Sequence, residues 1–163
     1  MDPILLPRDP GEIELCRRMQ RHGDEILRLC AVCLEDGEAA RRAASLAFIA
    51  SARNMQGDVR MGLLRLAVGQ IRRALGPLRW RIGKKPAPGD ALFDRLMALS
   101  PRDRALLVLR CDLGLSAGQA ARILRMRPPR ATRRVNRLCR MLEIPCPDAA
   151  SSLLRKKELP PVG

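Results

Sequence analysis

Four arginines near the C-terminal end of the chain recur at helical spacing: Arg130, Arg133, Arg137 and Arg140. At about 100° of rotation per residue, an α-helix would place all four on one face. The opposite face would carry only apolar side chains: Ala131, Val135, Leu138 and Leu142. Guanidinium groups pair with phosphates and with guanine edges through two parallel hydrogen bonds. The pattern therefore predicts an amphipathic helix with one core-facing stripe and one cationic stripe that suits a polyanion.

Neighbouring residues extend this cationic stripe into a candidate DNA-contact set. Its members are Arg127, Arg130, Thr132, Arg133, Arg134, Arg137 and Arg140. In a helix that enters a DNA groove, N-terminal residues lie closest to base edges, so we expect base contacts from Arg130, Thr132 and Arg133. Later arginines would neutralise backbone phosphates, which adds affinity without sequence information. The alternative interpretation of such a charge run is a solvated basic face.

The composition also favours a polyanionic partner. The 163 residues include 31 Lys+Arg against 17 Asp+Glu, which gives a formal net charge of +14. Nucleic acid and an anionic membrane surface both fit such an excess. Only four of the 31 are lysines, although a genome rich in G+C would enrich arginine regardless of function. Aromatic residues make up 2% and β-branched residues are sparse, so we expect an all-α fold.

Start and stop signals divide residues 91–142 into expected helices. Ser100 precedes a proline as an N-cap, and Ser116 with Gln119 forms a capping box. Pro128-Pro129 fits only a first helical turn, where the missing N–H groups lose no bond. The expected helices cover residues 91–99, 101–111, 116–124 and 128–142, with Gly114 closing the second. A short helix, a turn of about three residues and a longer basic helix form a helix-turn-helix pattern.

The remaining residues predict a second helical domain, a linker and a tail. Apolar periodicity gives four helices at about residues 12–21, 24–34, 38–53 and 58–75. Gly23 marks the first break, since it can adopt the left-handed conformation that ends a helix. Residues 78–90 contain Gly, Pro and basic residues, which predicts a flexible linker. The expected organisation is a domain at 11–77, a linker at 78–90, a helix-turn-helix domain at 91–142 and a tail at 143–163.

Residues 99–142 resemble region 4 of the extracytoplasmic-function class of bacterial RNA polymerase sigma factors. The matching residues are Leu107-Val108-Leu109-Arg110, Gly114-Leu115-Ser116, Ala121 and Ile123-Leu124. The resemblance implies that this domain reads an upstream promoter element through Arg130, Thr132 and Arg133 or their neighbours.

Residues 11–77 resemble region 2 of the same family. The matching stretches are His22 to Leu29, Ala47 to Ala50, and Arg53-Asn54. The resemblance implies three partners, which are core RNA polymerase, double-stranded promoter DNA and an anti-sigma factor. The position of polymerase contact holds Arg41, Arg42, Ser45 and Leu46. Arginines stand there where the family usually has acids.

Two other functions stay open beside a sigma-like transcription initiation protein. The first is a stand-alone helix-turn-helix regulator that does not bind polymerase, which Arg41 and Arg42 favour. The second is a sigma mimic that occupies a sigma factor's partner without contacting DNA. Loss of function on replacing Arg130 and Arg133 would separate both DNA-binding proteins from the mimic.

A second basic stretch runs through residues 60–79. Its helical part could lie on a membrane surface as a basic amphipathic helix. The charge continues beyond the expected helix, so we favour a face toward DNA or the polymerase clamp. Arg72, Arg73 and Arg79 are therefore candidates for a secondary DNA contact.

Other reactive residues do not form a site in the sequence. Cys30 and Cys33 have zinc-ligand spacing, but both fall at helix-core positions without an obvious fourth ligand. His22 is the only histidine and is expected at a helix end. Neither a phosphate loop nor a nucleophile motif is present, so we expect neither an enzyme nor a metal or other cofactor. The sequence lacks secretory-signal features and a membrane span, which predicts a cytoplasmic protein with reduced cysteines.

Overall fold

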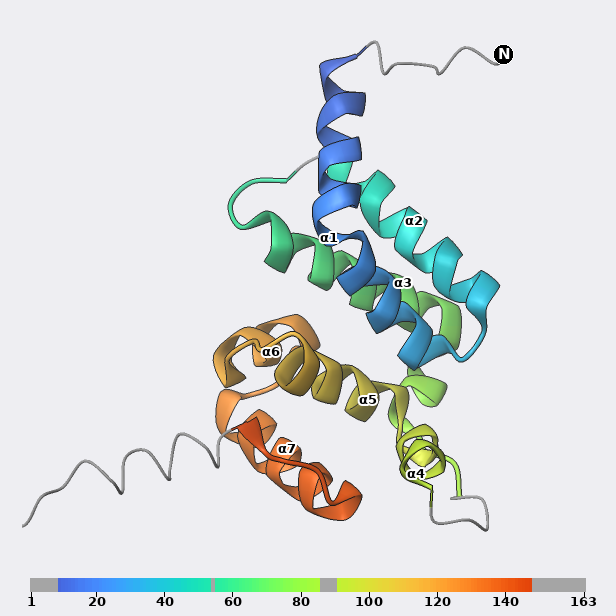
Figure 1. Cartoon of the computed structure of the whole chain (residues 1–163), viewed down its shortest axis with the longest axis vertical. Coiled ribbons are helices and arrows are strands. Elements are labelled where there is room, and N and C mark those ends of the chain that lie inside the picture. The colour runs from blue at the N-terminus through green and yellow to red at the C-terminus, as the bar shows by residue number, and fades with distance from the viewer. Residues whose placement is uncertain (1–8, 54, 86–90, 148–163) are drawn as a thin grey trace, which may run out of the picture. The chain divides into compact units, whose positions relative to one another are not determined.

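The computed structural model describes residues 9–53, 55–85 and 91–147, and within these ranges all regular structure is helical (Figure 1). The all-α prediction is therefore confirmed. The chain divides into two compact units, Met1–Gly76 and Pro77–Gly163, called unit 1 and unit 2 below. The expected tail beyond residue 147 and the linker residues 86–90 lie outside the described residues.

Unit 1 contains α1 (Pro10–Leu34), α2 (Gly37–Arg53) and most of α3 (Val59–Arg81). α1 and α2 run side by side (Figure 1). Small residues on the buried face of α2 allow this close approach: Ala40, Ala43, Ala44 and Ala47. Phe48 is the large buried side chain of α2, and the other two helices contribute branched aliphatic residues to the core: Ile26, Leu29, Leu63, Leu64 and Ile71. The core thus combines one alanine-rich helix with two helices that carry larger aliphatic residues.

The break expected at His22 to Asp24 is absent, and α1 is one continuous helix. A glycine inside a helix costs only about 1 kcal/mol relative to alanine, so Gly23 does not have to end it. Contacts on both sides of Gly23 hold the continuous form. Arg18 donates a hydrogen bond to the Ser51 carbonyl at 2.8 Å, and Glu25 accepts two hydrogen bonds from Arg60. The prediction was wrong because tertiary contacts outweigh a weak local signal.

The predicted start of the linker at residue 78 differs from the structure, in which residues 78–85 belong to unit 2. α3 passes through a kink at Gly76, where φ is 77°, and continues to Arg81. Trp80 is 3% exposed, and the Lys84 N–H donates to the Ala98 carbonyl at 2.8 Å. A Cβ on Gly83 would lie 2.5 Å from the Ala98 oxygen, so only glycine fits this close approach. The contacts of Gly83 and Lys84 attach this segment to the second unit.

Unit 2 contains α4 (Leu92–Ala98), α5 (Pro101–Leu107), a π-helical turn η1 (Val108–Asp112), α6 (Ala117–Leu124) and α7 (Pro128–Leu142). The sequence predicts one helix from Pro101 to Cys111, whereas the α-helical part ends at Leu107. The π-turn follows, and Arg110 within it is buried with its guanidinium donating to the Leu115 carbonyl. Burial of this arginine against a carbonyl beyond the helix explains the change of helical pitch.

Candidate functional site

The candidate site is built from α6, α7 and the three residues between them. Ser116 and Gln119 form a complete capping box at the start of α6, with N···O distances of 3.1 and 3.0 Å. α6 ends at Leu124, and its C-cap residue Arg125 adopts left-handed backbone geometry with φ 52°. Pro128-Pro129 occupies the first turn of α7. The local signals therefore set both helix starts, and a positive φ at a non-glycine residue sets the turn between them.

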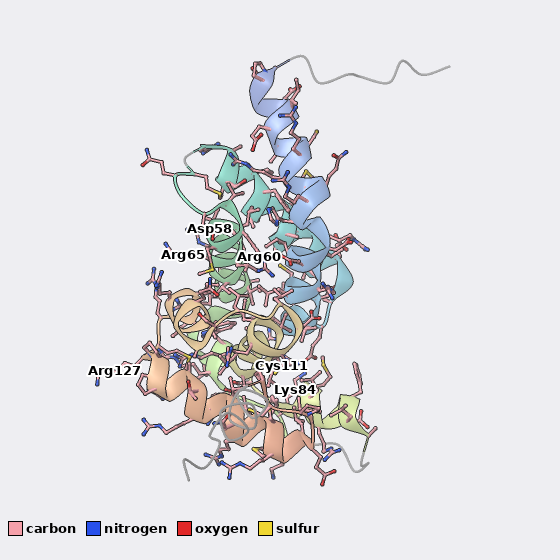
Figure 2. All side chains as sticks on the ribbon, turned by 60° about the vertical axis from the view of Figure 1, so that its left-hand side comes forward. Asp58, Arg60, Arg65, Lys84, Cys111 and Arg127 are labelled. Carbon is pink, nitrogen blue, oxygen red and sulfur yellow. The ribbon has the colours of Figure 1, made fainter. Side chains whose placement is uncertain are left out.

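α7 presents two faces of opposite chemistry. Its buried face carries Ala131, Val135, Leu138, Cys139 and Leu142. Burial of each Val or Leu side chain stabilises the fold by roughly 1.5–3 kcal/mol. The other face carries exposed arginines at positions 130, 133, 137 and 140. Figure 2 shows Arg127 projecting outward at the start of the same helix. Core packing thus fixes which side of α7 is presented to solvent.

Arg134 differs from the other arginines of the candidate set. Its Nε and Nη2 atoms donate to the two oxygens of Asp103 at 2.9 and 2.6 Å. The hydrogen bonds that Arg134 donates to Asp103 raise the pKa of Arg134 above its ordinary value. The Asp103 backbone N–H in turn donates to Ser100 Oγ at 3.1 Å. Asp103 thereby joins the cap of α5 to the side of α7, and Arg134 is engaged within the protein.

Sequence reasoning missed the partner of Arg134 and two further arginines near α7. Asp103 and Arg134 are 31 positions apart, so no local pattern indicates that they pair. Arg102 in α5 and Arg125 before α7 line a concavity together with the first arginines of α7. Their separation in the sequence gives no periodic signal. Only the fold brings these residues together.

The four residues at the candidate polymerase contact share the exposed face of α2: Arg41, Arg42, Ser45 and Leu46. Arg42 pairs with Glu38 at 3.3 Å, and both side chains are largely exposed. Leu46 and Ile49 are 44% and 51% exposed. This surface therefore combines a small apolar centre with arginines, while the alanine face of the same helix is buried.

The candidate secondary DNA contact falls in both units. Arg73 in unit 1 and Arg79 in unit 2 are exposed, whereas Arg72 is half-buried. The kink at Gly76 lies between Arg73 and Arg79. These three residues therefore do not share one straight helical face.

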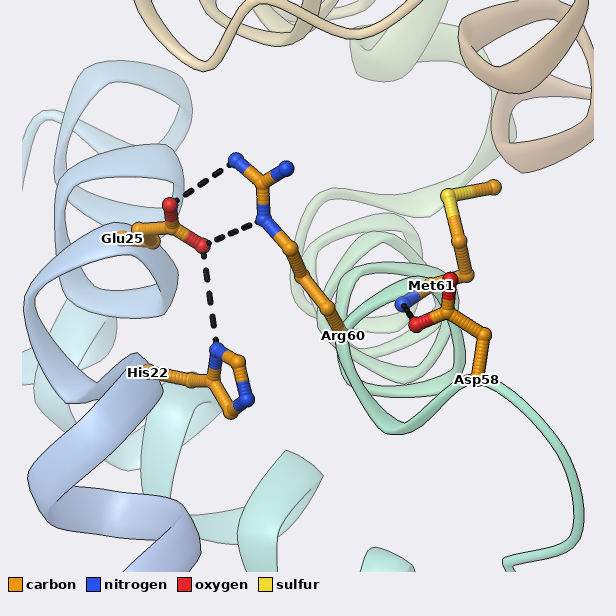
Figure 3. Close-up of polar contacts among 5 residues, drawn as sticks. All are labelled: His22, Glu25, Asp58, Arg60 and Met61. Atoms are coloured by element: carbon orange, nitrogen blue, oxygen red, sulfur yellow. Dashed lines mark hydrogen bonds and ion pairs between the residues drawn. The ribbon is translucent and has the colours of Figure 1, made fainter.

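His22 lies within α1 and not at the expected helix end. Figure 3 shows His22, Glu25 and Arg60 in one polar cluster between α1 and α3. Arg60 donates to both Glu25 oxygens at 2.9 and 2.8 Å, and His22 Nδ1 lies 4.0 Å from Glu25. At the start of α3, Asp58 accepts from the Met61 N–H at 3.1 Å. The ion pair between Glu25 and Arg60 therefore links α1 to α3 within unit 1.

The Cys-x-x-Cys pair packs in the core, as its position predicts. Cys30 and Cys33 are 0% and 1% exposed. Burial raises the pKa of the Cys30 thiol to about 12. Among the described residues, no group of three or more His, Cys, Asp or Glu could hold a metal ion. None of the described helices combines the length and apolarity needed to cross a membrane.

Comparison with protein-family models and with curated proteins finds no match for this chain.

Proposed function

We propose that the protein binds double-stranded promoter DNA through α6 and α7, as part of a sigma-like factor for transcription initiation. One observation carries the proposal. The arginine face of α7 is exposed along the helix, while the opposite face is anchored in the core of unit 2. The net charge of +14 supports a polyanionic partner. A transcription factor of this kind acts in the cytoplasm.

The geometry also refines the candidate contacts. Arg130 and Arg133 lie in the first turns of α7, where side chains of a groove-bound helix reach base edges. Thr132 is half-buried beside them. Arg137 and Arg140 are exposed farther along and suit backbone phosphates. Arg134 leaves the proposed contact set because its guanidinium pairs with Asp103.

The exposed face of α2 supports a second, protein-binding surface. Leu46 and Ile49 supply apolar area, and Arg41 and Arg42 flank it. In the sigma-like proposal this face binds core RNA polymerase. The basic character of the face favours the second candidate, a stand-alone regulator that binds DNA without polymerase.

Fluorescence anisotropy with promoter-length duplex DNA tests the DNA-binding part. We expect Arg130→Ala and Arg133→Ala each to weaken specific binding by about 1–3 kcal/mol and to relax selectivity at one base pair. Arg17→Ala is the matched control, because it removes an exposed arginine from α1. Equal affinity of the control and the two α7 variants would refute DNA recognition by this helix.

Capture of core RNA polymerase at low salt tests the polymerase part. We expect the full-length protein to retain core polymerase, and Arg41→Ala with Leu46→Ala to reduce retention while DNA affinity stays unchanged. Absence of retention, with specific DNA binding intact, would select the stand-alone regulator. Retention that survives replacement of Arg130 and Arg133, without any DNA binding, would select a sigma mimic.

A further inference from the structure

A concavity of about 640 Å³ lies at the start of α7, and arginines dominate its wall. Its lining residues are Arg102, Arg125, Met126, Arg127, Pro129, Arg130 and Arg133. These residues come from α5, from the connection between α6 and α7, and from the first turns of α7. No acidic residue is among them. The fold therefore gathers five positive charges around one open volume.

The electrostatics of this concavity favour a multivalent anion. Like charges held close together repel each other, and the N-terminus of α7 adds the positive end of a helix dipole. Arg127 occupies the N-cap position and makes no side-chain capping hydrogen bond to the helix. Asp103, the carboxylate among the residues that line the adjoining hollow, is paired with Arg134. An incoming anion would lower the repulsion among all five guanidinium groups at once.

The arrangement suits an anion whose negative charges are closer together than those along a DNA backbone. A helix in the major groove meets the phosphates of each strand on its flanks, and each phosphate carries one charge. Here the cations surround a hollow instead of following a line. A chain of linked phosphates places three or more negative charges within such a hollow. Arginine is the side chain best suited to hold such a chain, since each fork binds two oxygens.

A second hollow of about 260 Å³ adjoins the first and shares Arg102, Met126 and Arg130 with it. Its wall also contains Leu106 and Leu124. These two leucines are almost fully buried, so the half-buried Met126, which lines both hollows, is the apolar side chain that can contact the flat organic group that some polyphosphates carry. Inorganic and nucleoside-linked phosphate chains are thus two sources of the same chemistry.

We propose that the arginine concavity is a binding site for a polyphosphate chain, and that an occupied site excludes DNA from the start of α7. The exclusion, but not the binding, rests on the proposed DNA-binding function. Arg130 and Arg133 would serve both ligands, whereas Arg102 and Arg125 would serve the polyphosphate. This division makes the site separable from the DNA surface by mutation.

Isothermal titration calorimetry of the full-length protein with sodium tripolyphosphate, at fixed ionic strength, tests the binding. We expect saturable binding that weakens by about tenfold or more in Arg102→Ala and in Arg125→Gln, the low end for a lost charge-assisted hydrogen bond. The control is Arg137→Ala, which removes an exposed α7 arginine outside the concavity. Arg102→Lys and Arg125→Lys retain the charge, and thermal unfolding of each variant verifies that it folds.

The outcomes are distinct. Equal weakening in Arg137→Ala and in the two concavity variants, or no saturable binding, would overturn the site. Tighter binding of ATP than of tripolyphosphate would support it and assign the second hollow to the nucleoside. Equal binding would support it with an inorganic chain as the ligand.

Competition separates this inference from the proposed function. In anisotropy experiments, tripolyphosphate should displace DNA from the unmodified protein and should displace it poorly from the Arg102→Ala, Arg125→Gln double variant. DNA binding without tripolyphosphate binding would refute the inference and leave the proposed function standing. Tripolyphosphate binding by a protein that binds no DNA would support the polyphosphate site and refute the proposed DNA-binding function.

Discussion

The ion pair between Asp103 and Arg134 makes the orientation of α7 testable. Asp103→Asn removes the negative charge while keeping the side-chain shape. The Asp103 side chain is 10% exposed and that of Arg134 is 42% exposed. The ion pair is therefore intermediate in solvent exposure between a surface salt bridge and a buried one. Exposed pairs contribute about 0.2–1 kcal/mol, and hydrogen bonds to charged groups about 1.5–3 kcal/mol. Because solvent screens Arg134, we expect a loss of about 1–2 kcal/mol.

The assay is urea unfolding of the full-length protein, combined with a double-mutant cycle. The single variants are Asp103→Asn and Arg134→Gln, and the coupling energy follows from the double variant. Since about 1 kcal/mol shifts the melting temperature of a domain this small by roughly 4–8 °C, thermal unfolding provides a second measurement. Arg133→Ala is the control. Its side chain is exposed, so its effect on stability should stay within about 0.5 kcal/mol.

DNA titrations complete this test. If Arg134 acts within the protein, Arg134→Gln should leave the salt dependence of DNA binding unchanged. A phosphate contact would instead flatten the slope of log K against log salt by about 0.9. A coupling energy near zero together with such a flattened slope would refute the assignment of Arg134 to Asp103.

Four further substitutions test other parts of the fold. Gly83→Ala should destabilise unit 2 by about 1–3 kcal/mol in chemical unfolding, because the new methyl meets the Ala98 carbonyl. The control Gly69→Ala lies in α3 with open space around it and should instead stabilise the protein by about 1 kcal/mol. Arg125→Gly should stabilise by about 1 kcal/mol, since glycine removes the cost of a left-handed side-chain-bearing residue; a loss of stability would contradict this. Burial raises the pKa of the Cys30 thiol from an ordinary value of 9.0 to about 12, so the stability that the buried neutral thiol contributes is complete below pH 9 and is lost as pH rises toward 12. Unfolding measured at pH 8 and pH 10.5 should show this loss, and Cys30→Ala should reduce it.

Local signals predicted the helices of unit 2 with good accuracy. Ser100, Ser116 and Pro128 start helices in the structure where the sequence places the starts. These signals work because a cap satisfies backbone groups within a few residues of itself. The two faces of α7 follow from the 3.6-residue period alone, so the exposed arginines were also predictable.

Signals that depend on distant contacts could not be read in the same way. Gly23 reads as a break, yet Arg18 and Glu25 hold α1 together through residues more than thirty positions away. The pairing of Arg134 with Asp103 spans 31 positions and has no periodic signature. The π-turn that buries Arg110 likewise depends on a carbonyl beyond the helix end.

The attachment of Gly83 and Lys84 to unit 2 sets where the chain can be divided for study. The Lys84 N–H and the close approach at Gly83 belong to the packing of Ala98 and Ser100. A C-terminal fragment that starts at residue 91, as the sequence pattern would suggest, would lose both contacts. A fragment that starts at Pro77 keeps both contacts, so a division after Gly76 preserves the packing of unit 2.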